Sequence, residues 1–380
     1  MTGNGPSFTL GIEEEYLLVD LETMDLANDP PPALLDECRQ RCAQPEQIAR
    51  ELLRSQIEVG TRKCTSIAEA REDLMELRRV VVDVAGNYGL APIAASTHPF
   101  AHWAEQKQTP KQRYRNLEEQ MAAAARRMLI CGMHVHVGLD DDELRIDLLS
   151  QMTYFLPHLL VLSTSSPFWE GQNTGLKSYR LTVFDALPRT GLPEHFSSYG
   201  EYQRHVDVLV KAGLIEDATM IWWDLRPSAR YPTLETRIFD VCTNIEDAIS
   251  LAAMTKCIMR RLYRLRLDNQ RWRRYNRMLI NENRWRAMRY GSDEGLIDLA
   301  KGELVEFRHL LGEILGQIDE DAQYFGCEAE VAHARTIIDR GTSAHQQVAV
   351  YESALAAGKS EAAALQEVVG FLISTTSRGL

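Results

Sequence analysis

The 380-residue sequence predicts an α+β domain built on a mostly antiparallel sheet. Apolar and polar residues alternate in several short segments of the first two-thirds, as they do in strands, and helical segments lie between them. Some predicted strands follow one another at hairpin distance, whereas others are separated by longer crossovers. The last third has the apolar spacing of helices almost throughout.

The predicted elements follow from this alternation. We expect strands at residues 7–20, 53–61, 90–97, 129–139, 219–226 and 233–242. We expect helices from the Pro30–Pro32 turn to about Cys42, from Ser66 to Gly86 or Gly89, over 112–128 and over 142–163. Ser66 and Glu69 have the spacing of a capping box. The helical region after Asn244 is interrupted at Gly291, Gly326, Gly341 and Gly358.

Composition narrows the classes of protein that the chain can belong to. No Gly/Ser linker divides it, so we predict one domain over 1–380, strand-rich over 7–244 and helix-rich over 245–380. The net charge of -12 argues against a nucleic-acid or anionic-membrane surface. The N-terminal MTGNGPSFTL lacks the features of a signal peptide, and no apolar run is long enough to span a membrane. Seven cysteines without a CxxC pair predict free buried thiols, so we expect a cytoplasmic protein.

The first predicted strand, FTLGIEEEYLLVD, contains three consecutive glutamates. Because side chains alternate between the two faces of a strand, Glu13 and Glu15 share one face and Glu14 lies on the apolar face. Two carboxylates on one face repel each other unless a cation lies between them. Glu14 needs an arginine partner or an edge position, and the sequence does not identify its partner.

Three other predicted strands also have ionisable groups on one face. These are Glu58, with Glu51 seven residues before it, the pair His134 and His136, and the pair Glu235 and Arg237. One such strand is as typical of a solvated face as of a functional site, so the prediction depends on all four together. If the faces converge, they form a carboxylate-rich site suited to Mg²⁺ and ATP rather than to a structural zinc ion.

Eleven arginines lie between Arg260 and Arg289, interleaved with Trp and Tyr. In isolation this pattern is typical of a nucleic-acid surface. The acidic remainder of the chain and the helical period instead favour internal salt bridges, or anchoring of loops over the site. We therefore expect no nucleic-acid partner.

Several motifs resemble those of one family. GIEEEY, ELLRSQIE, CGMHVHVG and TLETRIFD look like bacterial carboxylate–amine ligases related to glutamate–cysteine ligase, type 2, of the glutamine synthetase superfamily. The resemblance covers nearly the whole chain and extends to STHPF, SSPFWEG, SYR, PRTG, IWWDLRPS, ENRWRA and RGTSA. It implies a glutamine-synthetase-like catalytic domain, in which a curved, mostly antiparallel sheet forms a funnel with helices packed outside.

The resemblance also implies an activity. ATP would enter one end of the funnel and an amino acid the other, with two or three Mg²⁺ ions for which Mn²⁺ would substitute. The γ-carboxylate of glutamate, or of a related acid, would become an acyl phosphate, and an amine such as cysteine would displace the phosphate. The chain is shorter than the longer bacterial glutamate–cysteine ligases, and their cysteine-recognition loops have no clear counterpart. We therefore expect at least weak glutamate–cysteine ligase activity and leave the physiological acceptor open.

Roles follow for individual residues. The resemblance assigns one metal to Glu13, His134 and Glu235, and the others to Glu15, Glu51 and Glu58. Arg237 would stabilise charge on the transferred phosphoryl group, and His136 would contact phosphate or substrate. Substrate or phosphate binding would involve Arg180, Arg189 and Arg226, with surface ion pairs as the alternative for the first two and pairing with Asp224 for the third. One of Trp222 and Trp223 is expected in the core and the other in a pocket wall.

Two other functions are compatible with these residues. A sensor with the same fold would bind ATP or an amino acid without consuming it, and a metal-dependent hydrolase would use the same acidic site. ATP dependence separates the hydrolase from the ligase. Ligases of this kind often associate, so a homo-oligomer is a further expectation, although no interface can be located in the sequence.

Overall fold

The computed structural model describes residues 5–380, apart from the side chains of Arg113 and Leu117. The first four residues, part of the segment in which we expect no signal peptide, lie outside this range. The main sheet has the strand order β10-β11-β5-β1-β3-β2, with β4 paired to the second half of β1, and every pairing is antiparallel. Its strands are β1 (Leu10–Asp20), β2 (Ile48–Arg50), β3 (Gln56–Gly60), β4 (Leu90–Ile93), β5 (Met133–Gly138), β10 (Leu225–Pro227) and β11 (Thr233–Thr236).

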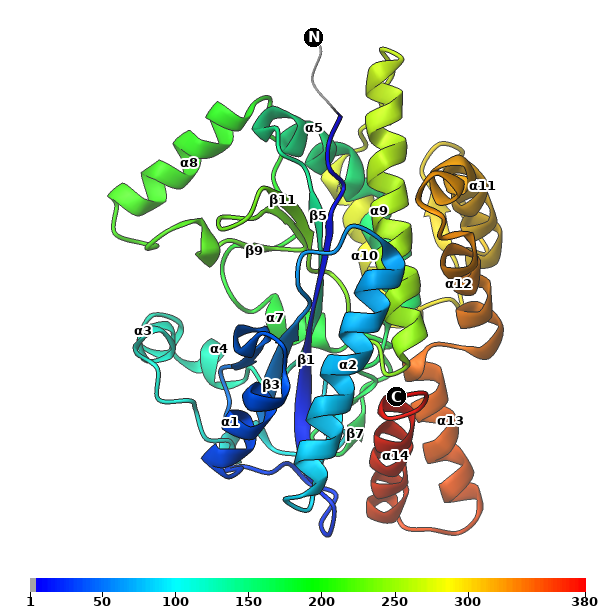
Figure 1. Ribbon diagram of the computed structural model, residues 1–380. Coiled ribbons are helices and arrows are strands. Elements are labelled where there is room, and N and C mark those ends of the chain that lie inside the picture. The colour runs from blue at the N-terminus through cyan, green and yellow to red at the C-terminus, as the bar shows by residue number, and fades with distance from the viewer. Residues whose placement is uncertain (1–4) are drawn as a thin grey trace.

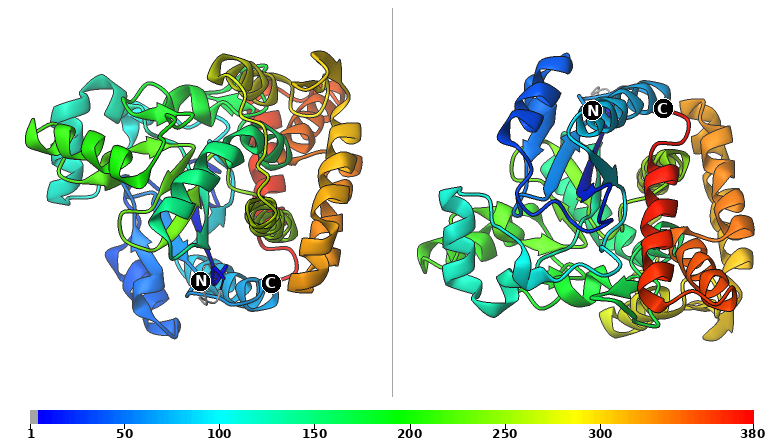
Figure 2. Two further views of the ribbon diagram at one scale, coloured as in Figure 1. Left: turned by 90° about the horizontal axis from the view of Figure 1, so that it is seen from above. Right: turned by 90° about the horizontal axis from the view of Figure 1, so that it is seen from below.

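Helices cover one face of this sheet (Figure 1). The helix α2 (Ile67–Gly86) packs on β1, β3 and β4, and α9 (Ile245–Leu267) packs on β1 and β5. The views along the sheet show α9 between the sheet and the C-terminal helices (Figure 2). Among the described residues, no helix has both the length and the apolar character needed to span a membrane.

The remaining helices surround this centre. They are α1 (Pro32–Arg41), α3 (Gln112–Met121), α4 (Ala123–Arg126), α5 (Asp142–Met152), α6 (Leu156–Ser163), α7 (Arg180–Phe184), α8 (Tyr199–Lys211), α10 (Arg277–Tyr290), α11 (Phe307–Phe325), α12 (Glu328–Arg340), α13 (Ser343–Ala356) and α14 (Glu361–Thr376). Short 3-10 turns cover Pro45–Gln47, Trp103–Glu105, Thr153–Phe155 and Ala218–Met220. Three small sheets pair β6 (Phe168–Trp169) with β7 (Gln172–Asn173), β8 (Thr190–Gly191) with β9 (Trp222–Trp223), and β12 (Leu296–Asp298) with β13 (Glu303–Val305).

The central strand β1 has the two faces that its sequence predicts. Leu10, Ile12 and Tyr16 are buried against the helices, together with Glu14. The glutamates on either side of Glu14 lie on the opposite, partly exposed face. The alternation expected for a strand is therefore confirmed, and it separates a helix-covered face from an open face.

Glu14 has the arginine partner that the sequence could not identify. Arg78 of α2 donates to Glu14 from Nε (2.8 Å) and from NH2 (2.6 Å), and both side chains are fully buried. Tyr16 donates its hydroxyl to the same carboxylate, and Arg78 also donates to the carbonyls of Cys242 and Thr243. This bidentate pair joins α2 to β1 through the core.

Several predicted elements differ from the structure. The strand over 219–226 is wrong: it is a 3-10 turn followed by β9 and β10, which belong to different sheets because β9 pairs with β8 and β10 with β11. The strand over 233–242 ends at Thr236, after which Arg237 donates its amide to the Asp224 carbonyl. The helix over 112–128 is broken at Ala122, whose φ is 48°.

Other boundaries are also corrected. The helix over 142–163 is interrupted by the 3-10 turn Thr153–Phe155 before the Pro157-containing start of α6. β3, β4 and β5 are shorter than the predicted strands, and β2 was not predicted because it has only three residues. All seven cysteines are free thiols, as predicted, and all but the partly exposed Cys42 are buried.

Candidate active site

The predicted site residues meet on the open face of the main sheet. Antiparallel pairing places Glu15 opposite Glu58, and Glu13 opposite His134. His136 and Glu235 are opposite each other on β5 and β11. Glu51 follows the end of β2, two residues after the partner of Glu58. The four strand faces therefore converge as the sequence predicts.

One group on this face consists of carboxylates alone. Oxygens of Glu15, Glu51 and Glu58 lie within 4.8 Å of one another, and we call these residues the carboxylate cluster. Burial and the neighbouring charge of Glu51 raise the pKa of Glu15 to about 8, against the amide of Gly132, which donates to it at 2.7 Å. Burial and the hydrogen bond with Glu51 also raise the pKa of Glu58. The charges of Arg180 and Arg237 act on Glu15, but none of the three carboxylates forms an ion pair with a basic side chain among the described residues.

A second group contains histidine. Ligand atoms of Glu13, His136 and Glu235 also lie within 4.8 Å of one another, and we call these residues the histidine cluster. His134, to which the resemblance assigned this role, lies beside the cluster: its Nδ1 is 3.0 Å from Glu13 and 3.9 Å from Glu235. Burial together with Arg237 lowers the pKa of His134 to about 4.

His136 is oriented at one nitrogen and faces a carboxylate at the other. Its Nδ1 lies 2.9 Å from the Thr233 hydroxyl, while its buried Nε2 makes no hydrogen bond among the described residues and lies 3.4 Å from Glu13 Oε1. Burial disfavours its charged form, but Glu13 and Glu235 raise the pKa of His136 above its ordinary value. An oriented imidazole whose Nε2 makes no hydrogen bond is suited to a metal ion or an anionic oxygen.

Glu235 binds two arginines. Arg226 donates to both of its oxygens at 2.8 Å and 3.1 Å, and Arg237 donates at 2.5 Å. Burial opposes ionisation of Glu235, but the two guanidinium groups hold its pKa well below the ordinary value. Pairing with Asp224, the alternative considered for Arg226, is not found among the described residues, and Asp224 is bound by Arg284 of α10.

The other two predicted arginines have different environments. Arg180, the first residue of α7, is 3% exposed and faces the carboxylate cluster and Arg237. Arg189 donates to the Met220 carbonyl at 3.0 Å and lies over the Trp222 ring. Among the described residues, Arg189 therefore does not form a surface ion pair, which was the alternative considered for it. Its contacts stabilise the β8–β9 region.

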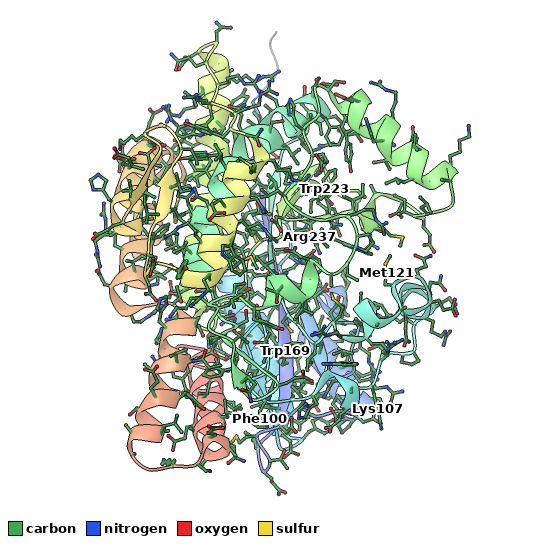
Figure 3. The ribbon with its side chains drawn as sticks, turned by 180° about the vertical axis from the view of Figure 1, so that it is seen from behind. Phe100, Lys107, Met121, Trp169, Trp223 and Arg237 are labelled. Atoms are coloured by element: carbon green, nitrogen blue, oxygen red, sulfur yellow. The ribbon has the colours of Figure 1, made fainter. Side chains whose placement is uncertain are left out.

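Of Trp222 and Trp223, one was expected in the core and the other in a pocket wall, and the structure agrees with this in part. Trp222 is buried beneath Arg189. Trp223 packs on Phe196 and Tyr202 under α8, in a small apolar cluster separate from the main core. From behind, Arg237 lies between Trp223 and Trp169 (Figure 3).

The arginine-rich segment makes internal salt bridges, as predicted. Arg260 and Arg264 bind Asp321 of α11, and Arg266 and Arg271 bind Asp147 of α5. Arg284 connects α10 to Asp224, between β9 and β10, and so anchors the strand that holds Arg226.

Both clusters fit divalent cations. Carboxylate oxygens are the ligands that Mg²⁺ prefers, and neighbouring carboxylates without a basic partner are stabilised by either protons or a cation. The histidine cluster offers two carboxylates and a buried imidazole nitrogen that makes no hydrogen bond among the described residues, although Glu235 already binds two arginines.

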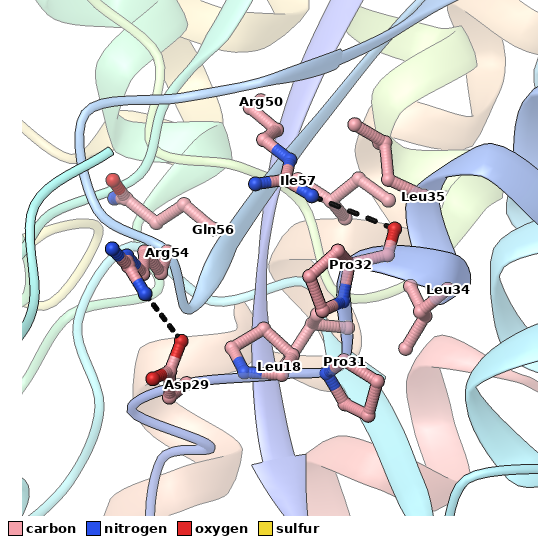
Figure 4. Close-up of a pocket in the computed structure, with 11 residues that line it drawn as sticks. Leu18, Asp29, Pro31, Pro32, Leu34, Leu35, Arg50, Arg54, Gln56 and Ile57 are labelled. Atoms are coloured by element: carbon pink, nitrogen blue, oxygen red, sulfur yellow. Dashed lines mark hydrogen bonds and ion pairs between the residues drawn. The ribbon is translucent and has the colours of Figure 1, made fainter. Parts of the chain in front are cut away.

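Sequence reasoning missed two features of the site. The backbone amide of Gly132 holds Glu15 in place, and buried Asp240 lies close to Arg180. Neither has a sequence signal of its own, since an amide is the same in every residue and Asp240, the last residue of TLETRIFD, lies on the other face of the predicted strand from Glu235 and Arg237. A separate cavity of about 40 Å³, lined by Pro31, Leu34 and Ile57, has room only for a few water molecules (Figure 4).

Solved structures share this fold. A glutamate–cysteine ligase from Francisella tularensis, in complex with AMP, aligns with a TM-score of 0.67 at 14% identity over 97% of this chain and 89% of that chain. A bifunctional glutathione synthetase from Pasteurella multocida aligns with a TM-score of 0.67 at 14% identity over 96% of this chain and 52% of that chain. The predicted α+β ligase fold is therefore confirmed.

Sequence relatives and the fold define the class of protein: it is an ATP-dependent carboxylate–amine ligase. The chain belongs to the glutamate–cysteine ligase family 2, whose model matches residues 9–369. A relative from Rhodospirillum rubrum, named "Putative glutamate--cysteine ligase 2", is 60% identical over 98% of this chain and 96% of its own. A relative from Jannaschia sp. with the same name is 54% identical over 96% of each.

Proposed function

We propose that the protein uses ATP and two or three Mg²⁺ ions, replaceable by Mn²⁺, to join the γ-carboxylate of glutamate or a related acid to an amine such as cysteine. The observation that carries the proposal is the convergence of the carboxylate and histidine clusters beside Arg237 on one open face. Bound divalent ions would neutralise phosphate oxygens and hold the nucleotide in line. The predicted cytoplasmic location is part of the proposal.

The chain's own residues have distinct tasks. Glu15, Glu51 and Glu58 would hold one or two ions, and Glu13, His136 and Glu235 would hold the other. Arg237, fixed by Glu235, would stabilise the charge that develops on the transferred phosphoryl group. His134, kept neutral by its low pKa, supports Glu13.

The reaction has two steps. A carboxylate oxygen of the acid forms a bond to the γ-phosphorus as the bond to ADP breaks. The amine nitrogen then forms a bond to the acyl carbon as the bond to phosphate breaks, and the proton that the amine loses leaves with the phosphate. Neither step needs a covalent nucleophile from the protein, so positioning and charge neutralisation supply the catalysis.

Phosphate release from ATP and Mg²⁺ tests this proposal, with glutamate fixed and a panel of amines varied. Mass spectrometry would identify the coupled product. Release that requires glutamate and one amine supports the proposal and names the acceptor. Release with another acid retains the ligase reaction and changes the substrate, and absence of release with every pair would refute the ligase proposal in favour of a sensor. Amide cleavage without ATP would favour the hydrolase.

A further inference from the structure

The environment of Arg180 differs from that of two other buried arginines. Arg78 binds both oxygens of Glu14, and Arg284 binds Asp185 and Asp224. Arg180 is equally buried, yet its two terminal nitrogens reach only the Arg237 carbonyl, at 3.4 Å, and its Nε has no partner among the described residues. A buried guanidinium without a carboxylate partner is costly, so its position must be maintained by other contacts.

The Arg180 guanidinium lies over the Phe184 ring, and Asp240 holds the backbone around Arg180 through serine residues. Asp240 is fully buried, and its Oδ2 accepts hydrogen bonds from the Ser165 amide (2.8 Å) and the Ser166 hydroxyl (2.7 Å). Its Oδ1 accepts one from the Ser178 hydroxyl at 2.9 Å. Ser166 Oγ in turn accepts the backbone N–H of Arg180 at 3.1 Å. Asp240 therefore fixes the start of α7, and its negative charge acts on the Arg180 guanidinium without a direct bond.

Gly132 leaves the space that the guanidinium occupies. A Cβ added at Gly132 would lie 2.3 Å from NH2 of Arg180 and 2.9 Å from its Cζ. The same residue donates its amide to Glu15. The guanidinium of Arg180 thus lies against the strand backbone beside the carboxylate cluster, where only a residue without a side chain permits it.

We propose that Asp240 is a positioning residue that holds Arg180 in the site without pairing with it, so that Arg180 remains free to bind the carboxylate of the acid substrate. This inference rests on the proposed ligase function. The acceptor surface consists of the guanidinium beside Gly132, and Ser166 and Ser178 transmit the effect of Asp240 to it. Full pairing by a protein carboxylate, as in Arg78, would remove this binding capacity.

Steady-state kinetics of four variants test the inference. Arg180→Gln should raise KM for the acid about 100-fold, since it removes a charged hydrogen bond. Asp240→Asn should raise that KM about tenfold with KM for ATP unchanged, and the double variant should match Arg180→Gln alone. Asp247→Asn changes another buried aspartate, bound to Arg340 and His333 away from the site, and should leave both KM values unchanged.

Other outcomes would overturn the inference. Additive effects in the double variant, or an equal rise of KM for ATP, would show that Asp240 has only a structural role. If Asp240→Asn does not fold, Ser166→Ala replaces it, since it removes the hydroxyl that links Asp240 to the Arg180 amide; an unchanged KM for the acid would then contradict the inference.

Turnover by the wild-type enzyme distinguishes a failure of this inference from a failure of the proposed function. Absence of turnover with every acid would refute the ligase proposal itself. A crystal structure of Asp240→Asn, or of Ser166→Ala, then decides the positioning role independently. Displacement of the Arg180 guanidinium from the Arg237 carbonyl supports it, and an unmoved guanidinium overturns it.

Discussion

The two faces of β1 carry the same residue type in opposite electrostatic states. On the helix-covered face, Glu14 is fully buried and receives two hydrogen bonds from Arg78 and one from Tyr16. On the open face, Glu15 lies among carboxylates, and its pKa is raised to about 8. Adjacent glutamates in one strand therefore have different roles because the strand alternates its sides.

The difference between these two environments shows how one strand can keep some of its carboxylates available for cation binding. A buried carboxylate with a fixed arginine is already neutralised and contributes to folding. Carboxylates left without such a partner repel one another in the absence of ligand and favour a divalent cation. The histidine cluster is intermediate, since Glu235 has two arginines while Glu13 has only histidines.

The largest expected effect lies on the open face. Arg237→Ala or Glu235→Gln should lower turnover about 10³-fold or more, because an arginine at a transferred phosphoryl group contributes that much. Coupled phosphate release measures the loss, and circular dichroism checks the fold. Arg230→Ala, at an exposed position of the β10–β11 turn, is the matched control and should retain full activity. Turnover like that of the wild type in a folded Arg237 variant would refute its role.

Substitutions on the helix-covered face should change the stability of the protein. Arg78→Met should lower the free energy of unfolding by about 3–5 kcal/mol, because it leaves Glu14 buried and unpaired. Denaturant titration measures this change, and Glu14→Leu with Arg78→Met should recover part of it. Arg79→Met alters an exposed pair on the same helix and should change stability by about 0.5 kcal/mol or less. An equal loss in the two arginine variants would contradict the distinction between them.

Addition of a divalent metal should change the stability of the protein only through the carboxylates of the open face. Without divalent ions, Glu58→Gln should be at least as stable as the wild type, since one repelling carboxylate is gone. Mg²⁺ at about 100 times its Kd should stabilise the wild type by about 2.7 kcal/mol and the variant much less. Thermal melts with EDTA and with Mg²⁺ measure both effects. Equal stabilisation of the two proteins would place the metal elsewhere.

The smallest expected effect is a pH dependence in metal-free protein. Between about pH 4.5 and 8, folded Glu15 keeps a proton that the unfolded chain has lost, so stability falls as pH rises, by at most about 1.4 kcal/mol per pH unit for this group. Glu15→Gln should reduce this slope, whereas Glu352→Gln, an exposed substitution on α13, should not. Denaturant titrations in EDTA at several pH values give the slopes; an unchanged slope in Glu15→Gln would be evidence against the raised pKa.

The sequence predicts the open face well because strand alternation is local. The positions of Glu13, Glu15, Glu58 and Glu235 follow from a period of two residues. The choice of His136 over His134 for the histidine cluster depends on the registers of β1 with β5 and of β5 with β11, which one strand does not contain. The break of the strand over 219–226 has the same origin, because β9 and β10 pair with different strands.

Hydrogen-bond partners that are distant in the sequence could not be predicted from local sequence patterns. Arg78 lies 64 residues from Glu14, within an amphipathic helix in which any of several arginines could have faced the core. The network of Asp240 with Ser166 and Ser178 spans more than 60 residues. Hydrogen-bonding residues of this kind are found by their geometry, whereas the apolar patterns that build the fold are present in the sequence itself.

Anomalous diffraction from Mn²⁺ in crystals with a non-hydrolysable ATP analogue tests the central claim most directly. The account predicts ions within about 2.2 Å of oxygens of the carboxylate cluster and of the histidine cluster, with phosphates beside Arg237 and no ion near Glu14. Ions bound elsewhere, or a nucleotide bound away from the open face of β1, would contradict it.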